Sequence, residues 1–173
     1  MLFGDGAGAA VISASDKKRG IISSTLSSDG SKQSILYCEA MPLLNPYIKQ
    51  EGERVIPSIK MQGQEVFKFA VRSVTETIET VLSEGNLTPE DVKFVISHQA
   101  NRRIIEVVAK NCNIPIEKFF MNLERYGNTS SASVGIALDE LVQTGDLKSG
   151  DIIILVGFGG GMTSGAILME WNA

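Results

Sequence analysis

The sequence predicts an α/β fold built on a mixed β-sheet. Apolar residues recur at helical spacing from residue 62 to about 84, whereas short β-branched runs such as 92–96 have the length of buried strands. These two kinds of segment alternate along the chain in the order ββ, α, β, α, β, α, β, β. We therefore expect helices packed on a mixed sheet of about five strands.

The first predicted elements are a leading pair of strands. Residues 8–14 and 20–27 are short, rich in small and β-branched residues, and separated by a polar segment, so we expect them to pair antiparallel as in a hairpin. The chain enters a glycine-rich turn directly after Met1-Leu2-Phe3, and this abrupt opening indicates a truncated start. Residues 28–60 hold three of the five prolines and little periodicity, which predicts a long irregular connection that packs over a site.

The central elements place polar residues at the end of a strand. After the helix at 62–84, Thr88 and Pro89 open a turn that leads into the strand at 92–96. The polar residues 97–101 follow, and a helix starts near Ile104. A strand, a polar turn and a helix in this order put side chains at the carboxyl edge of an α/β sheet, where ligands bind.

The last elements repeat that arrangement. A short strand at 118–121 precedes a second polar segment, and Thr129 or Ser130 caps a helix that runs to about Thr144. Strands at 151–156 and 166–171 flank the turn 157–165. This turn is so rich in glycine that its backbone is expected to approach another group closely.

Composition and charge restrict the classes of function. With 43% hydrophobic and 21% charged residues in 173, the chain matches one globular domain with a real core. Its net charge of −4 and pI near 5.1 argue against nucleic-acid binding, which needs a basic field. Cys38 and Cys112 lie far apart and His98 is the only histidine, so a zinc site lacks ligands. We expect no cofactor and two reduced structural cysteines.

The sequence also argues against a membrane protein. No apolar run reaches the roughly 18 to 20 residues that span a bilayer, and no basic segment followed by an apolar one opens the chain. We therefore expect a cytoplasmic protein without a membrane or nucleic-acid partner.

His98 and Asn128 are the candidate catalytic residues. Alone, His98 fits either a general base or a structural histidine, and Asn128 fits an ordinary Asx cap. Both follow predicted strands at helix N-termini, and two neutral donors aimed at one oxygen suit the stabilisation of an enolate or oxyanion. The turn 159–161 lacks the Lys-Ser/Thr of a phosphate-binding loop, so a backbone oxyanion donor fits it better. The Gly4-x-Gly6-x-x-Ala9 pattern precedes a strand rather than a helix, which weakens a dinucleotide-binding interpretation.

Several basic residues stand out on this acidic chain. They are ordinary solvated charges on helices or, if they cluster, a surface for a phosphate-bearing carrier or an acidic protein. These residues are Lys68, Arg72, Arg102, Arg103 and Lys110.

Six sequence blocks occur in one order over nearly the whole chain. They are Phe3-Gly4-Asp5-Gly6-Ala7-Gly8-Ala9, Ser28-Asp29-Gly30, Met61-x-Gly63-x-Glu65-Val66-Phe67-Lys68-Phe69-Ala70-Val71, His98-Gln99-Ala100-Asn101-x-Arg103-Ile104, Gly127-Asn128-Thr129-Ser130-x-Ala132-Ser133 and Gly157-Phe158-Gly159-Gly160-Gly161. Together they closely resemble the ketoacyl-acyl-carrier-protein synthase III family.

This resemblance implies a thiolase-like half of a larger enzyme. Residues 1–30 are then the last two strands of an N-terminal half, residues 31–173 form the C-terminal thiolase-like domain, and the chain forms a homodimer or larger assembly. The family condenses an acyl-coenzyme A primer with malonyl-acyl carrier protein, a decarboxylative Claisen condensation that initiates fatty acid synthesis. Alternatives are a related thiolase-fold synthase for another coenzyme A thioester, and a non-catalytic module for carrier binding or dimerisation.

The resemblance also assigns roles to residues. His98 and Asn128 match the pair that stabilises the thioester enolate, and Gly160 matches the backbone oxyanion donor. The carrier-binding segment comprises Gln99, Ala100, Asn101, Arg102 and Arg103, with Lys68 adding to it, while Phe67 and Asn101 lie near the pantetheine path. The nucleophilic cysteine has no counterpart in this chain, so we expect the isolated chain not to condense. Ser164 stands where many members have tryptophan, which bears on acyl-group preference.

Overall fold

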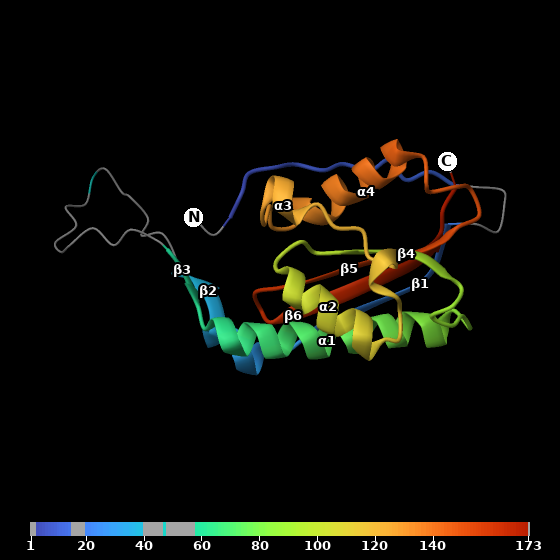
Figure 1. The fold of residues 1–173 in the computed structure, drawn as a ribbon. Helices are drawn as coiled ribbons and strands as arrows, with labels where there is room; N and C mark the ends of the chain where they lie inside the picture. Colours follow the sequence, from blue (N-terminus) through green and yellow to red (C-terminus); the bar gives the residue numbers. More distant parts are fainter. Residues whose placement is uncertain (1–2, 15–19, 40–46, 48–57, 173) are drawn as a thin grey trace.

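A mixed four-stranded sheet forms the centre of the computed structural model, which describes residues 3–14, 20–39, 47 and 58–172 (Figure 1). Its strands lie in the order β1-β6-β5-β4. They are β1 (Gly20–Ser28), β6 (Thr163–Glu170), β5 (Ile152–Gly159) and β4 (Val92–Ser97). β4 and β5 are parallel, whereas β6 runs antiparallel to both β5 and β1. The predicted α/β class with a mixed sheet is confirmed.

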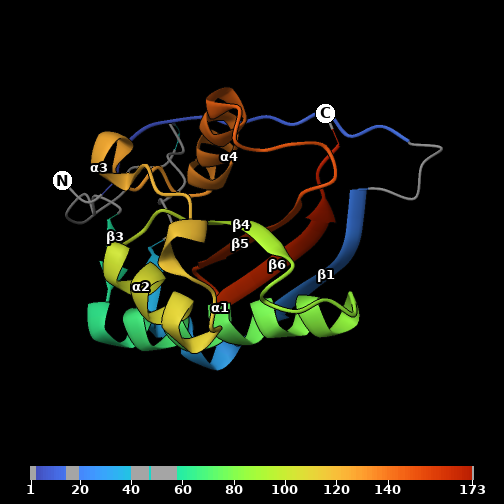
Figure 2. The ribbon, with the colours of Figure 1, turned by 45° about the vertical axis from the view of Figure 1, so that its right-hand side comes forward.

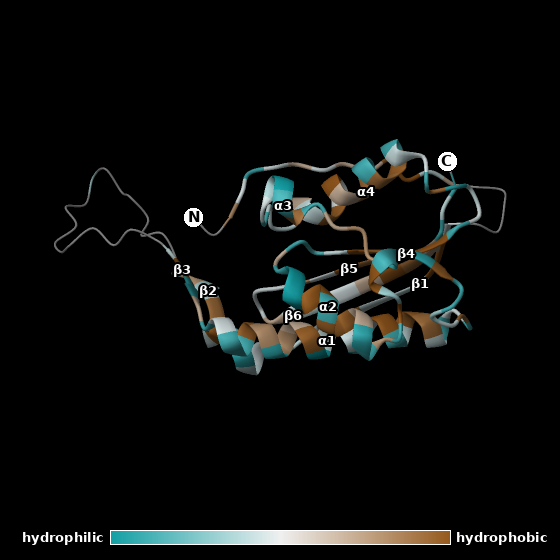
Figure 3. Ribbon diagram, in the orientation of Figure 1, coloured by the Kyte–Doolittle hydropathy of each residue, from teal (hydrophilic) through white to brown (hydrophobic). Residues whose placement is uncertain are grey.

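Helices cover both faces of this sheet, as Figures 1 and 2 show. α1 (Gly63–Glu84) and α2 (Arg102–Asn111) pack on one face, and α4 (Ala132–Thr144) packs on the other. Successive side chains of a strand point to opposite faces, so the buried Val95 joins the α1–α2 core while its neighbour Ile96 joins the α4 core. Figure 3 shows the apolar residues concentrated where sheet and helices meet.

The helix predicted from residue 62 to about 84 is α1. Ala70, Val74 and Ile78 recur every four residues and are completely buried, so one stripe of the helix faces the sheet. Burying a side chain such as Ile78 contributes about 1.5–3 kcal/mol. Across the described ranges, no helix is both long enough and apolar enough to cross a membrane.

Short elements complete the described part of the chain. The connection predicted as irregular at 28–60 contains the 3₁₀ helix η1 (Gly30–Ile35) and β2 (Leu36–Cys38), which pairs antiparallel with β3 (Ile59–Met61). Residues 40–46 and 48–57 of that connection lie outside the described residues. The remaining short helices are η2 (Ile116–Lys118) and α3 (Leu123–Tyr126).

The predicted pairing of residues 8–14 with 20–27 is wrong. Residues 3–14 form no strand and run along α4 (Figures 1 and 2), where a Cβ on Gly8 would lie only 3.1 Å from the Gly135 Cα atom. The predicted second strand does form, as β1, but its antiparallel partner is β6. Pairing with β6 along the whole of β1 outweighs the proximity in sequence on which the hairpin prediction relied.

The strand predicted at 118–121 is not formed as a strand and leaves one isolated bridge to β4. Phe119 forms one parallel bridge with Val95, and the Phe120 N–H donates to the Val95 carbonyl oxygen at 3.1 Å. The preceding residues are taken up by η2, so the sheet has four strands rather than about five. The division of the chain near residue 30 stays a prediction, although β1 belongs to the same sheet as β6.

Candidate active site

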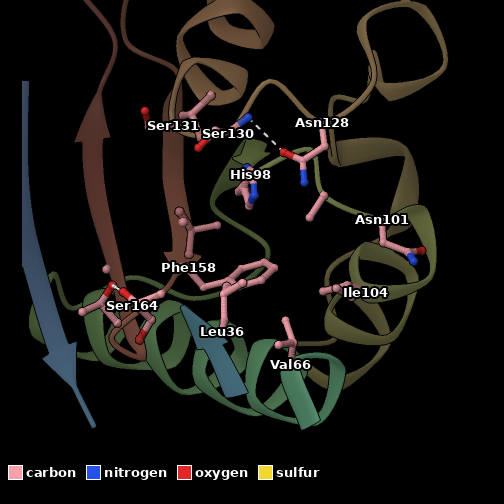
Figure 4. A pocket seen from close by; sticks show the side chains of 18 of the residues that line it. Leu36, Val66, His98, Asn101, Ile104, Asn128, Ser130, Ser131, Phe158 and Ser164 are labelled. Carbon is pink, nitrogen blue, oxygen red and sulfur yellow. Dashed lines mark hydrogen bonds between the residues drawn. The ribbon is translucent and has the colours of Figure 1, made fainter. Parts of the chain in front are cut away.

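A cavity of about 1060 Å³ opens at the carboxyl ends of the parallel strands β4 and β5 (Figure 4). His98 and Asn128 line one side of it, and the apolar side chains of Leu36, Val66 and Phe158 line the other. The predicted catalytic pair therefore comes together at one cavity, although 30 positions separate the two residues in the sequence.

His98 is held rigidly at the end of β4. Its N–H donates to the Val156 carbonyl oxygen at 2.8 Å, and its ring meets Phe158 edge to face with centroids 5.2 Å apart. Its Nδ1 lies 2.7 Å from the Ser133 Oγ. Burial lowers the pKa of His98, and a hydrogen bond with the Ser130 backbone opposes that shift without reversing it. The imidazole is therefore neutral at neutral pH.

Asn128 is fixed by its own loop. Its Oδ1 accepts a hydrogen bond from the Ser130 N–H at 2.9 Å, and its carbonyl oxygen accepts one from the Gly4 N–H at 2.8 Å. The Asx-turn interpretation is compatible with the catalytic one, because the turn uses only the amide oxygen of Asn128 and not its amide nitrogen. The amide nitrogen is left facing the cavity (Figure 4).

Gly160 lies in the turn that follows β5 and lines the same cavity. A Cβ at this position would lie 3.3 Å from the Leu36 carbonyl oxygen, so the backbone approach predicted from the glycine content is real. The completely buried Met162 exchanges two backbone hydrogen bonds with Asp29, at 2.7 and 3.0 Å, and fixes the turn. Within the described ranges no backbone carbonyl outside the strand ladder accepts from the Gly160 N–H, and its role as an oxyanion donor stays a prediction.

Gln99 of the predicted carrier-binding segment is buried, and its role in carrier binding stays a prediction. Gln99 has no exposed surface, and its side chain is used entirely inside the protein. The amide Nε2 donates to the carbonyl oxygens of Ser97 and Phe120 at 2.8 and 3.2 Å, and Oε1 accepts from the Asn122 N–H at 3.1 Å. Gln99 thus ties the His98 turn to the segment that leads to Asn128.

Glu140 of α4 anchors that segment from the opposite side. Its carboxylate accepts hydrogen bonds from the Asn122 Nδ2, the Arg125 Nη2 and the Tyr126 hydroxyl, at 2.8, 2.8 and 2.6 Å. Burial acts to raise the pKa of Glu140, but these hydrogen bonds outweigh it and hold the pKa below its usual value. Sequence reasoning missed Glu140, since no motif marks it, and missed Ser133, whose signal was its place in the Asn128 block.

The predicted basic surface is only partly free. Lys68 and Arg102 form ion pairs within their own helices, with Glu65 at 2.8 Å and Glu106 at 2.9 Å. Arg103 is exposed on α2, and no ion pair to it occurs among the residues that the structure describes. These pairs weaken the field of the predicted patch and leave Arg103 and Lys110 as its exposed charges outside any ion pair in the described part of the chain.

Residues of the predicted pantetheine path line the catalytic cavity. Phe67 and Asn101, the two residues of that path, both contribute to its wall, as does Ala100 of the predicted carrier-binding segment. The Asn101 Oδ1 also caps α2 by accepting from the Arg103 N–H at 2.9 Å. The buried Ser164 lines the cavity as well. These positions suit a long thioester arm that enters beside α2.

The two cysteines differ in their surroundings. Cys112 is buried, and burial raises its pKa to about 11, which agrees with the predicted structural role. Cys38 is exposed on β2 and lines the cavity, and the structural role predicted for it stays a prediction. Over the described ranges, no three His, Cys, Asp or Glu side chains gather to hold a metal ion.

Comparisons with known proteins identify the family. The model of the family described as "3-Oxoacyl-[acyl-carrier-protein (ACP)] synthase III C terminal" matches residues 82–171, and that of "3-Oxoacyl-[acyl-carrier-protein (ACP)] synthase III" matches residues 1–30. The chain belongs to the 3-oxoacyl-acyl-carrier-protein synthase III family. The resemblance that the sequence blocks indicated is thereby confirmed, and His98 and Asn128 lie in a synthase III fold.

Individual synthase III proteins are similar over almost all of this chain. Beta-ketoacyl-[acyl-carrier-protein] synthase III of Clostridium novyi is 49% identical over 99% of the chain and 52% of the relative, and that of Clostridium acetobutylicum is 44% identical over the same shares. The chain spans about half the length of the curated relatives it matches.

Solved synthase III structures share the fold. The crystal structure from Aquifex aeolicus has a TM-score of 0.79 at 40% identity, covering 91% of this chain and 46% of that one. The crystal structure from Pseudomonas aeruginosa has a TM-score of 0.81 at 29% identity, covering 92% of this chain and 47% of that one.

Proposed function

We propose that this chain supplies the decarboxylation part of the active site of a β-ketoacyl-acyl-carrier-protein synthase III. The whole enzyme would condense an acyl-coenzyme A primer with malonyl-acyl carrier protein to initiate fatty acid synthesis. The observation that carries the proposal is the placement of His98 and Asn128, two neutral hydrogen-bond donors, at one cavity large enough for a thioester.

In the proposed reaction, the bond between the malonyl Cα and its carboxylate breaks and carbon dioxide leaves. The electron pair moves to the thioester carbonyl, whose oxygen becomes an enolate held by the His98 Nε2–H and the Asn128 Nδ2–H. The Cα of the enolate then attacks an acyl thioester, and the Gly160 N–H stabilises the oxyanion that forms there. A neutral imidazole suits the first step because it donates a hydrogen bond without protonating the enolate carbon.

The test is carbon dioxide release from malonyl thioesters, with malonyl-coenzyme A and malonyl-carrier as substrates. Without an acyl acceptor, the enolate takes a proton from water and becomes an acetyl thioester. His98→Ala and Asn128→Ala should each lower this rate on the order of a hundredfold, which is the cost of one oxyanion donor. Asn111→Ala, an exposed asparagine at the end of α2 outside this cavity, is the matched control. Equal rates for all variants would refute the proposal.

We further propose that the isolated chain does not complete the condensation. Cys112 is too buried and too weakly acidic to carry an acyl group, and Cys38 follows no strand-to-helix turn that would activate it. Formation of ketoacyl-carrier from acetyl-coenzyme A and malonyl-carrier by this chain alone would contradict that.

Carrier protein is the proposed macromolecular partner, and Arg103 its main contact. Arg103→Glu should weaken carrier binding about tenfold, mostly through slower association at low salt. Lys93→Glu, a reversal on the exposed side of β4, is the control. Unchanged affinity in Arg103→Glu would support a carrier docking site elsewhere.

Self-association is proposed from exposed apolar side chains. Val11, Ile12 and Leu26 are 99%, 84% and 91% exposed. Such surface favours a dimer or larger assembly, and a monomer by light scattering at high concentration would contradict this. The cytoplasmic location stays a prediction.

A further inference from the structure

Ser133 occupies the first turn of α4 with only 2% of its surface exposed. Its Oγ contacts two groups of the His98 turn: the His98 Nδ1 at 2.7 Å and the Gln99 backbone N–H at 3.1 Å. A backbone N–H only donates, so the Gln99 contact occupies a lone pair of the Ser133 oxygen. The single hydroxyl proton is left to donate, and Nδ1 lies at the shorter distance.

Two tautomers of the neutral imidazole compete at this position. If Ser133 donates to Nδ1, the ring proton sits on Nε2. If the ring proton sits on Nδ1 instead, Nδ1–H donates to the Ser133 Oγ. The direction of the hydrogen bond between His98 and Ser133 therefore differs between the two tautomers.

We propose that Ser133 is a positioning residue that sets the His98 tautomer, donating its hydroxyl proton to Nδ1 so that Nε2–H is the donor available to the cavity. This inference rests on the proposed function, since a donor at Nε2 matters only if an oxyanion forms there. The Gln99 N–H contact supports this direction, because it occupies one lone pair of the Ser133 oxygen and holds the hydroxyl beside Nδ1.

The test is nitrogen-15 NMR of the imidazole. The chain contains one histidine, so its ring resonances are unambiguous. Long-range proton–nitrogen correlations distinguish a protonated ring nitrogen from an unprotonated one. At neutral pH the unmodified chain should show the Nε2–H tautomer, and Ser133→Ala should shift the population toward Nδ1–H. Ser131→Ala, the neighbouring exposed serine without a side-chain hydrogen bond to the helix, should leave the tautomer unchanged.

Two further measurements separate a positioning role from a structural one. Ser133→Thr retains the hydroxyl and should retain the Nε2–H tautomer. Ser133→Ala should lower kcat for carbon dioxide release at least about tenfold with KM unchanged, because an imidazole in the wrong tautomer cannot serve the transition state. An Nδ1–H tautomer in the unmodified chain would overturn the proposal even if Ser133→Ala did not fold, and so would an unchanged tautomer in a folded Ser133→Ala.

The outcomes also separate this inference from the proposed function. The tautomer is measured without turnover. If the unmodified chain shows Nε2–H and Ser133→Ala shifts it, but no variant alters carbon dioxide release, the role of Ser133 stands and the proposed function fails. If His98→Ala abolishes release while Ser133→Ala leaves the tautomer unchanged, the function stands and this inference fails.

Discussion

Replacing Gln99 by leucine is expected to destabilise the fold without affecting any surface. The substitution keeps a similar side-chain volume but removes one acceptor and one donor group from a completely buried position. The Asn122 N–H loses its partner, which costs about 1–3 kcal/mol for a buried donor. The carbonyl oxygens of Ser97 and Phe120 lose a donor and add roughly 1 kcal/mol together. The expected total is about 2–4 kcal/mol.

Urea denaturation measures this loss. For a slope of about 2 kcal/mol per molar urea, the midpoint should fall by roughly 1–2 M at constant slope. Gln143→Leu is the matched control, because Gln143 is exposed on α4 and its amide donates to Asp139 on the same helix. This substitution should change stability by less than about 0.5 kcal/mol. A Gln99→Leu chain as stable as the control would refute the reasoning. If Gln99→Leu bound carrier protein more weakly at unchanged stability, that result would support the predicted carrier-binding role of Gln99.

Three other predictions follow from the titratable groups. The pKa of Glu140 lies below its usual value, so its hydrogen bonds stabilise the fold fully above pH 4.5 and are lost as pH falls through the folded-state pKa. The difference in stability between the unmodified chain and Glu140→Gln, measured in urea, should therefore shrink as the pH falls below 4.5. The pKa of His98 is lowered from 6.5, so the unfolded chain takes up a proton first and stability should fall as pH drops below 6.5. His98→Gln should remove this dependence of stability on pH. An equal dependence in both chains would contradict the lowered pKa of His98. At pH 8, Cys38 should react with iodoacetamide while Cys112, with its pKa near 11, stays unmodified until denaturant is added, as mass spectrometry of the two peptides would show.

The sequence predicted the parts of the site that follow from local order. His98 follows β4 and precedes α2, and the sequence placed Asn128 in a similar polar segment before a helix, so their meeting at one cavity was predictable from the sequence. The glycine turn was accessible too, because few other reasons exist for three consecutive glycines after a buried strand.

The rest depended on contacts between segments far apart in the sequence. Gln99 adjoins exposed residues along the chain, and only the packing of 120–122 beside the His98 turn buries it. Glu140 looks like any charge on a helix until α3 meets α4. The hairpin prediction failed for the same reason: local spacing favoured a neighbouring partner for β1, whereas its true partner lies near the other end of the chain.

That long-range pairing of β1 with β6 bears on how the chain folds during synthesis. About 135 residues separate the two strands, so at 5–20 residues per second the ribosome makes β6 roughly 7–27 s after β1. Throughout that interval β1 is a β-prone segment without its partner β6, and its Ile21 and Leu26 stay exposed even in the folded chain. The nascent chain should therefore depend on chaperones at this segment, and charged substitutions at Leu26 should lower its aggregation during translation.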